Sequence, residues 1–514
     1  MTFLKTLVTR IEQTPIGLNA GFLSFLAIIF IRNQLELVFE QTHNLTLSLE
    51  LNVVLTDHVH VVLAWSYVFL LSVVSLAIIG KRSWQASCRI ALVAFPLIWI
   101  PPIFDGLSGN SGAIVYQYNF DTFISSFLGL FLPWVDVAYV TVGVRIEVFV
   151  VSAFTVIYLL LVNEGKSRYL RAILCALMIY CAIFSMGYLP AILGALVGAS
   201  HIELLSQSVL GVNSTRAPIL WYLPIVIPLL ALLIYKVNQP LWGVFTSCIR
   251  IDRLAIYAIL AFGGFYSATQ TALIGLDWLN TYDLIYLSAA ILAIALAFIA
   301  MTALNDLCDT HIDQISNTHR PLIRQPNLVG EYKSLVALGV LASLSLCFLF
   351  KVTQPALLIT LLSLSAMYSL PPFRLRRFLI LAPLCLTIIG LACFIFGMAI
   401  VWNNSTPEQV NMTHVLSIGV LFFIASQFKD IKDIEGDRLS GVQTIATLLG
   451  PSKAYTILGI AIILAFMCTL FSGFIVVNAK TIVAGIVFLF AWLKLKNSET
   501  LFYAMGLSLL LLSI

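Results

Sequence analysis

The chain has 514 residues, of which 60% are hydrophobic and only 10% are charged. A soluble domain carries roughly 25% charged residues, so this composition excludes an ordinary soluble protein and favours one embedded in lipid. The formal net charge of +4 is small for this length and does not indicate a nucleic-acid partner. The nine Cys residues form no CxxC or Cys/His cluster, so the sequence predicts neither disulfides nor a zinc site.

Apolar runs recur along the whole chain, and each is long enough to cross roughly 30 Å of hydrocarbon as a helix. We therefore expect an all-α, polytopic transmembrane bundle of about 15 helices. A first block of about six spans covers residues 16–31, 61–80, 90–104, 141–162, 172–198 and 218–235. A second block of about nine covers residues 254–275, 284–304, 334–350, 355–370, 378–401, 413–429, 454–475, 481–493 and 501–514.

A short mixed segment that contains Pro240, residues 236–252, separates the two blocks. We place the domain boundary there, between an N-terminal transmembrane domain of unknown role (1–249) and a second domain (250–514). Lys and Arg are concentrated in alternate loops, as expected if the N-terminus is cytoplasmic. This alternation predicts that two acidic loops of the second domain face the cytoplasm.

The first acidic loop follows the long apolar run 284–304 and contains Asn305, Asp306, Asp309 and Asp313. At 100° per residue the three Asp side chains fall within roughly 60° of one another on a helix. Such carboxylates repel one another near a membrane unless a cation neutralises them. Because Mg²⁺ favours one or two carboxylates together with phosphate oxygens, the pattern predicts a site for a metal diphosphate.

The second acidic loop repeats this arrangement with Asp430, Asp433 and Asp437, again at the inner end of an apolar helix. Lys432 adds a charge suited to phosphate oxygens. The alternative is that acids at a membrane helix end are ordinary solvated loop residues. Since both loops are predicted on one face of the membrane, we expect the two clusters to hold one substrate.

Basic residues lie between the clusters, on the same predicted face. Arg320 follows the first cluster, and Tyr368 and Arg374 precede a run that ends with Arg376 and Arg377. Facing two acidic metal sites, some of these arginines should bind diphosphate. The alternative for Arg376 and Arg377 is that they only anchor the helix on the cytoplasmic side.

Three segments, in this order, resemble the signature regions of the UbiA superfamily of intramembrane prenyltransferases: NDLCDTHIDQISNTHRP, YSLPPFRLRR and DIKDIEGDRLSGVQTIATLLG. The resemblance covers about residues 250–514 and implies a nine-helix bundle there. Family members that act on hydroxybenzoate tend to have Lys four residues after the Tyr, whereas this chain has Pro372. The YSxPPxR form is similar to members that act on homogentisate, chlorophyllide or geranylgeranylglyceryl phosphate.

The resemblance implies an Mg²⁺-dependent prenyltransferase that moves an isoprenoid group from a prenyl diphosphate to an aromatic or lipid acceptor. It implies an enzyme among membrane lipids, in the inner or plasma membrane, whose active site faces the cytoplasm. The expected catalytic metal ligands are Asp306, Asp309, Asp430 and Asp433. The expected substrate-binding residues are Asn305, Asp313, Arg320, Tyr368, Arg374, Lys432 and Asp437.

Other functions remain open at this point. Relatives in the family transfer phosphoribosyl groups to polyprenyl phosphate, although the intact second acidic motif favours prenyl transfer. A transporter should have inverted repeats and polar residues at the midplane, whereas these acids gather at one membrane face. A soluble-type prenyl diphosphate synthase would have amphipathic helices, and a silent relative would not need both acidic motifs.

The first 250 residues match no motif. Arg145 and Glu147 lie near the outer end of the predicted span 141–162, where charges are rare. They indicate either a functional site or side chains that extend to the membrane interface.

Overall fold

The computed structural model describes residues 2–39, 51–109, 116–130, 132, 135, 140–316, 318–401, 412–431, 433–439, 441–471 and 479–494. All regular secondary structure in these residues is helical, which confirms the predicted all-α class. Within them, eleven helices are long and apolar enough to cross a membrane. The chain is therefore a multi-pass membrane protein.

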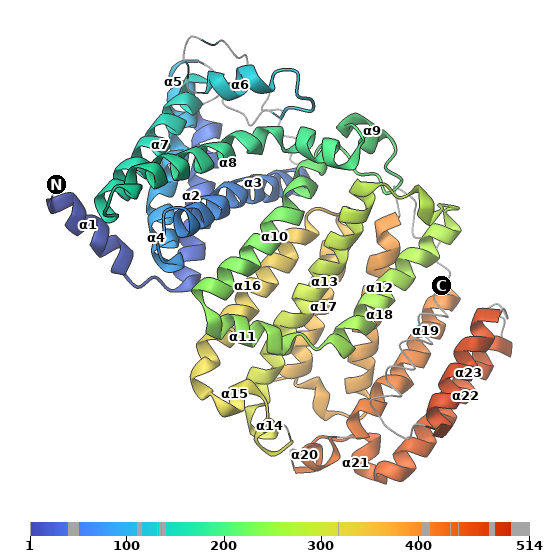
Figure 1. Ribbon diagram of the computed structural model, residues 1–514. Helices are drawn as coiled ribbons and strands as arrows, with labels where there is room; N and C mark the ends of the chain where they lie inside the picture. The colour runs from blue at the N-terminus through green and yellow to red at the C-terminus, as the bar shows by residue number, and fades with distance from the viewer. Residues whose placement is uncertain are drawn as a thin grey trace. The chain divides into compact units, whose positions relative to one another are not determined.

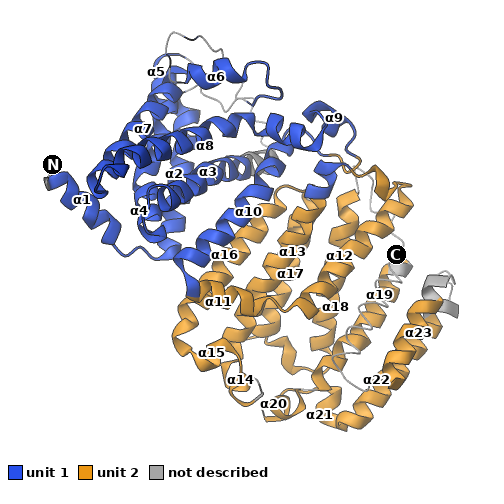
Figure 2. Cartoon of the chain, in the orientation of Figure 1, with its two compact units in different colours: residues 1–208, 212–239, 280–285 blue, residues 209–211, 240–279, 286–514 orange. Residues whose placement is uncertain are grey.

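The chain forms two compact units, coloured separately in Figure 2. Unit 1 comprises residues 1–208, 212–239 and 280–285, and unit 2 comprises residues 209–211, 240–279 and 286–514.

Unit 1 contains six of the eleven candidate spans, at the places where six were predicted. The helix α3 is central, because it packs against α4, α8 and α10. The helices of unit 1 are α1 (Thr2–Gln13), α2 (Leu18–Phe39), α3 (Leu51–Ile78), α4 (Trp84–Ala94), η1 (Phe95–Trp99), α5 (Ile100–Leu107), α6 (Phe123–Gly129), α7 (Val142–Val162), α8 (Ser167–Val197), α9 (His201–Ser206) and α10 (Ala217–Val237).

Unit 2 contains the remaining spans and the acidic loops. Its long helices are α12 (Ile251–Thr271), α13 (Thr281–Cys308), α16 (Val329–Cys347), α17 (Thr353–Ser369), α18 (Leu381–Val401), α19 (Met412–Ala425), α22 (Pro451–Phe471) and α23 (Ala479–Lys494). Its short elements are α11 (Gln239–Cys248), η2 (Leu276–Trp278), α14 (Thr310–Ser316), α15 (Pro321–Arg324), η3 (Pro326–Leu328), η4 (Leu375–Arg377), η6 (Ser426–Ile431), α20 (Ile434–Leu439) and α21 (Ile445–Leu449).

Eight of the nine spans predicted for the second domain correspond to these long helices. Three of them, α17, α19 and α23, have 17, 14 and 16 residues, which is short for a spanning helix. The ninth predicted span, 501–514, lies outside the residues that the structure describes.

The core of unit 2 is the contact between α12 and α18. A Cβ atom at Gly264 would lie 1.8 Å from the carbonyl oxygen of Phe394, and one at Gly397 would lie 1.7 Å from that of Ala261. Only glycine permits the two backbones to approach this closely. The close contact fixes the spacing of the two helices beside which the acidic loops gather.

The short elements α14, α15, α20 and α21 lie at one end of the unit 2 bundle (Figure 1). Contacts between α14 and α20 bring the two acidic loops together, although more than 100 residues separate them in sequence. The loops therefore share one end of the bundle.

Candidate active site

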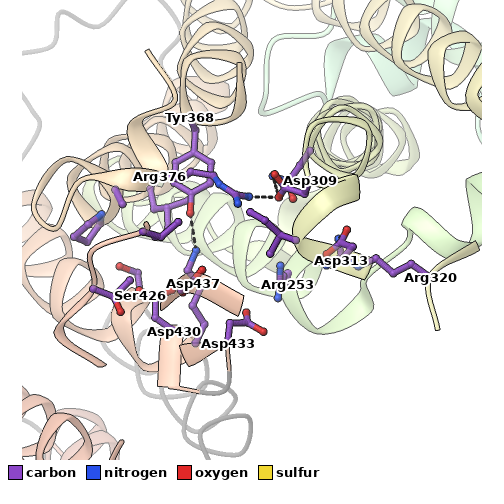
Figure 3. A pocket seen from close by; sticks show the side chains of 18 residues that line it. Arg253, Asp309, Asp313, Arg320, Tyr368, Arg376, Ser426, Asp430, Asp433 and Asp437 are labelled. Carbon is purple, nitrogen blue, oxygen red and sulfur yellow. Dashed lines mark hydrogen bonds and ion pairs between the residues drawn. The ribbon is translucent and has the colours of Figure 1, made fainter. Parts of the chain in front are cut away.

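A cavity of about 120 Å³ opens between the two acidic loops. We call it the acidic pocket. Figure 3 shows acids of both clusters pointing into it, from the segment around α14 and from the segment around α20. Its lining includes eight of the predicted site residues: Asn305, Asp309, Asp313, Arg320, Tyr368, Asp430, Asp433 and Asp437.

The first acidic cluster lies where α13 ends and α14 begins. The N–H of Asp309 donates to the Asn305 carbonyl at 3.0 Å, and that of Asp313 donates to the Asp309 carbonyl at 2.9 Å. The chain thus keeps a helical course through the acidic residues, and the expected common face of Asp309 and Asp313 is present in the pocket. Both side chains are buried.

Asp306 differs from its neighbours because it does not line the acidic pocket. Its Oδ1 pairs with Arg250 at 2.5 Å and with Arg320 at 2.9 Å. Arg320 also pairs with Asp313. One carboxylate oxygen of Asp306, Oδ1, is therefore shared by two guanidinium groups, although the sequence pattern predicts this residue to be a metal ligand.

Only one of the two carboxylate oxygens of Asp309 has hydrogen-bond partners. One of its carboxylate oxygens pairs with Arg376 and accepts a hydrogen bond from the Asn305 side chain at 2.9 Å. The other oxygen, Oδ1, is buried and has no hydrogen-bond partner. Burial raises the pKa of Asp309, and Arg376 only partly opposes this effect. A buried acceptor without a donor indicates that a cation or a donor group completes this site.

The second acidic cluster is free of such pairing. Within the described residues, the carboxylates of Asp430, Asp433 and Asp437 form no ion pair and no side-chain hydrogen bond. Burial, followed by the charge of Asp433, raises the pKa of Asp430 to about 6. Burial and the charges of Asp430 and Asp433 raise that of Asp437 to about 7. These carboxylates need a cation to remain charged together.

Lys429 is a site residue that the sequence did not reveal. Its Nζ donates to the Tyr368 hydroxyl at 3.1 Å and lies 5.4 Å from the centre of the Tyr368 ring. Burial alone would lower the pKa of Lys429, but Tyr368 and Asp430 more than offset this, so its pKa is raised. Lys429 therefore stays charged beside the pocket and orients the tyrosine.

One predicted basic residue, Arg374, does not line the pocket. Arg374 has a positive φ of 42° and donates to the Cys308 carbonyl over 3.4 Å, so it holds the loop after α17 against the end of α13. Lys432 lies outside the described residues. Arg253 and Arg376 supply positive charge to the pocket instead. In sequence, neither can be distinguished from a cytoplasmic anchor.

A second cavity, of about 130 Å³, adjoins the acidic pocket. We call it the apolar chamber. Side chains such as Phe298, Ile389 and Phe422 line it. The two cavities share the lining residues Arg253, Asn305, Tyr368, Leu386, Ser426 and Lys429. A charged end and an apolar end therefore meet at Tyr368, which suits a molecule with an anionic head and a hydrocarbon tail.

Magnesium fits this set of residues. In the described part of the chain, no group of three acids, His or Cys is close enough to form a complete metal site. Mg²⁺ commonly takes only one or two protein carboxylates, and phosphate oxygens and water complete its coordination. The unpaired oxygen of Asp309 and the free carboxylates of Asp430 and Asp433 provide ligands of this kind.

The second half of the chain is similar to known proteins. Residues 266–501 match the UbiA prenyltransferase family. Homogentisate phytyltransferase from Synechocystis is 29% identical over 180 residues, which are 34% of this chain and 57% of that protein. A bacteriochlorophyll synthase chain from Rhodobacter capsulatus is 30% identical over 31% of this chain and 55% of its own. The chain thus spans about half the length of these curated relatives.

Two solved structures of UbiA homologues are similar to part of the chain at low sequence identity. The apo form of a UbiA homologue from Aeropyrum pernix is 20% identical, with a TM-score of 0.40 over 51% of this chain and 96% of its own. A UbiA homologue from Archaeoglobus fulgidus, bound to DMAPP and Mg²⁺, is 14% identical, with a TM-score of 0.37 over 52% of this chain and 98% of its own.

Proposed function

Because residues 266–501 of this chain match the UbiA prenyltransferase family, we propose that it transfers a prenyl group from a prenyl diphosphate to an aromatic or lipid acceptor. The observation that carries the proposal is the junction of the acidic pocket with the apolar chamber. The pocket would take a metal diphosphate, and the chamber would take part of the isoprenoid tail. The Synechocystis relative is named for homogentisate, an aromatic acceptor, so an aromatic acceptor is our first choice.

We assign Asp309, Asp430 and Asp433, which have free oxygens at the pocket, as Mg²⁺ ligands, with each ion held by no more than two of them. When bound, Mg²⁺ would neutralise the diphosphate and favour its departure. We assign a different role to Asp306, which would position Arg250 and Arg320. Asn305 would hold the Asp309 carboxylate in place through its hydrogen bond of 2.9 Å.

The proposed reaction is substitution at the prenyl C1. The bond from C1 to the diphosphate oxygen breaks, and the electron pair leaves with the diphosphate. The acceptor then bonds to C1 and releases a proton. Arg320, Arg376 and Lys429 surround the pocket and would offset the negative charge that grows on the leaving group. Tyr368 lines both cavities and would separate the charged head from the tail.

We also propose that the chain has two domains, 1–249 and 250–514, close to the division between the compact units. The second domain would carry the reaction. The distribution of Lys and Arg supports an inner or plasma membrane location, with the acidic pocket facing the cytoplasm and lipid covering the helices.

Product analysis tests the activity. Purified full-length protein would be incubated with Mg²⁺, homogentisate and labelled geranyl, geranylgeranyl or phytyl diphosphate. We expect diphosphate release and a product with the summed mass of the prenyl group and acceptor. If homogentisate fails, a lipid extract replaces it. Absence of product with every donor and both acceptor sources would contradict the proposal.

Labelling with a membrane-impermeant thiol reagent tests the orientation. Single cysteines at the exposed positions His319 and Glu435 should react only from the cytoplasmic side. A cysteine at the exposed position Asp277, on the predicted outer side, should react only from the other side. Labelling of the first two positions from opposite sides would rule out one shared site.

A further inference from the structure

Unit 1 contains a buried carboxylate without a partner. Glu147, on α7, is 3% exposed. Within the described residues it forms no ion pair and no side-chain hydrogen bond. An ionised carboxylate in apolar surroundings costs several kcal/mol unless a proton, a cation or a hydrogen-bond donor meets it. Glu147 therefore requires a partner that the described residues do not supply.

A neighbouring acid shows how unit 1 satisfies a carboxylate that has a structural role. Asp105, on α5, is fully buried. It accepts hydrogen bonds from the Thr141 hydroxyl at 2.6 Å and from the Gly143 N–H at 2.8 Å. These bonds fix the first turn of α7. Glu147 lies one turn further along the same helix and has no comparable contacts, so helix capping does not explain it.

Glu147 lines a separate cavity of about 70 Å³. On this measure a single water needs only about 10–15 Å³, so the space exceeds one water. The other lining residues come from α3, α4, η1, α7 and α8 and are mainly apolar, for example Phe95, Val151 and Phe154. The cavity therefore favours a hydrocarbon group that carries one polar function.

An unpaired donor lines the same cavity. Trp65, on α3, is 3% exposed, and its indole N–H has no hydrogen-bond acceptor. The Arg32 guanidinium lies 5.4 Å from the centre of the Trp65 ring and is itself paired with Glu36 at 2.7 Å. Arg32 is paired through Nη1 only, its Nε has no hydrogen-bond partner among the described residues, and it does not line the cavity. Within the lining itself, Glu147 offers an acceptor and Trp65 offers a donor to a ligand.

The chemistry of the two groups selects the ligand. A hydroxyl group both donates and accepts, so it can donate to the Glu147 carboxylate and accept from the Trp65 indole N–H. An ammonium group cannot accept from the indole, and a carbonyl cannot donate to a carboxylate. We propose that this cavity of unit 1 binds the hydroxyl end of an apolar alcohol. The site is independent of the transfer reaction assigned to unit 2.

Photolabelling of the full-length protein tests the proposal. The probe is an aliphatic alcohol that carries a diazirine, and its methyl ether is the matched control because an ether accepts but does not donate. We expect the alcohol to label peptides that contain residues 65–76 or 147–158. Excess geraniol should reduce this labelling at least fivefold, and geranyl methyl ether should not.

Variants locate the labelled site. Glu147→Leu removes the polar partner, and Val151→Phe fills the cavity, so each should reduce labelling at least fivefold. Glu147→Gln still accepts a hydrogen bond and should retain most labelling. Glu164→Gln is the control, because its side chain is 90% exposed and lies outside the cavity. Monodispersity in detergent and an unchanged melting temperature would verify folding.

Equal labelling by the ether, or undiminished labelling of a folded Glu147→Leu protein, would overturn the proposal. So would labelling confined to other residues, because the cavity would then hold water only. Should Glu147→Leu fail to fold, Val151→Phe and Glu147→Gln still decide between the outcomes.

Discussion

The two acidic clusters of unit 2 have similar sequences but different surroundings. In the first, Asp306 is paired with two arginines and Asp309 with one. In the second, the described residues place no ion pair on any of the three carboxylates. The difference leads us to propose that the availability of the carboxylate oxygens, in addition to the Asp-x-x-Asp spacing, determines which of these residues bind metal.

From this comparison we propose that the two acidic clusters have different roles in the reaction. The first cluster would hold the arginines near the diphosphate, and Asp309 would add one metal ligand. The second cluster would supply most of the protein's metal ligands. The following predictions test this proposal, in order of decreasing effect.

Removal of the metal should have the largest effect. Excess EDTA should abolish product formation, because like-charged acids of the second cluster would then face the diphosphate without a cation. Turnover is measured as labelled product, and Mg²⁺ in excess of the chelator should restore it. Full turnover in excess EDTA would show that the reaction does not require a metal ion.

Substitution in the second cluster should come next. Asp430→Asn and Asp433→Asn should each reduce kcat by at least about a hundredfold, or roughly 2.7 kcal/mol. Because each change removes a like charge from a crowded cluster, the metal-free protein should be as stable as the parent or slightly more stable. Rates are measured at saturating Mg²⁺, and the melting temperature reports stability. Asp277→Asn, at an exposed position of η2, is the control that should leave kcat unchanged.

Substitution of Asp306 should give a smaller loss of a different kind. Asp306→Asn should reduce kcat by no more than about tenfold. It should also destabilise the protein by about 2 kcal/mol, less than a fully buried ion pair, because the Arg250 and Arg320 side chains are 18% and 17% exposed. A kcat loss equal to that of Asp433→Asn, with no change in melting temperature, would make Asp306 a metal ligand after all.

Much of this arrangement could be predicted from sequence, for identifiable reasons. Apolar runs long enough to span a membrane predicted the positions of most of the helices. Acidic residues at the inner helix ends predicted the position of the pocket. The short helices α17 and α19 were also predicted, because hydropathy indicates a span even where the regular helix is brief.

The partners of the acids could not be predicted. Asp306 and Arg250 are 56 positions apart, and Asp309 and Arg376 are 67 apart, so their pairing depends on tertiary packing. Arg253 and Lys429 were not distinguishable from membrane anchors, since a cytoplasmic helix end attracts basic residues for either reason. The unpaired indole N–H of Trp65 could not be predicted either, because a tryptophan in an apolar run indicates only packing.

The central claim is that the metal at the diphosphate is held mainly by the second cluster. Mn²⁺ in place of Mg²⁺ tests it directly, because bound Mn²⁺ broadens the ³¹P resonances of nearby geranyl diphosphate. The account predicts that Asp306→Asn keeps protein-dependent broadening, whereas Asp433→Asn loses most of it at the same metal concentration. Loss in Asp306→Asn together with full broadening in Asp433→Asn would contradict the account.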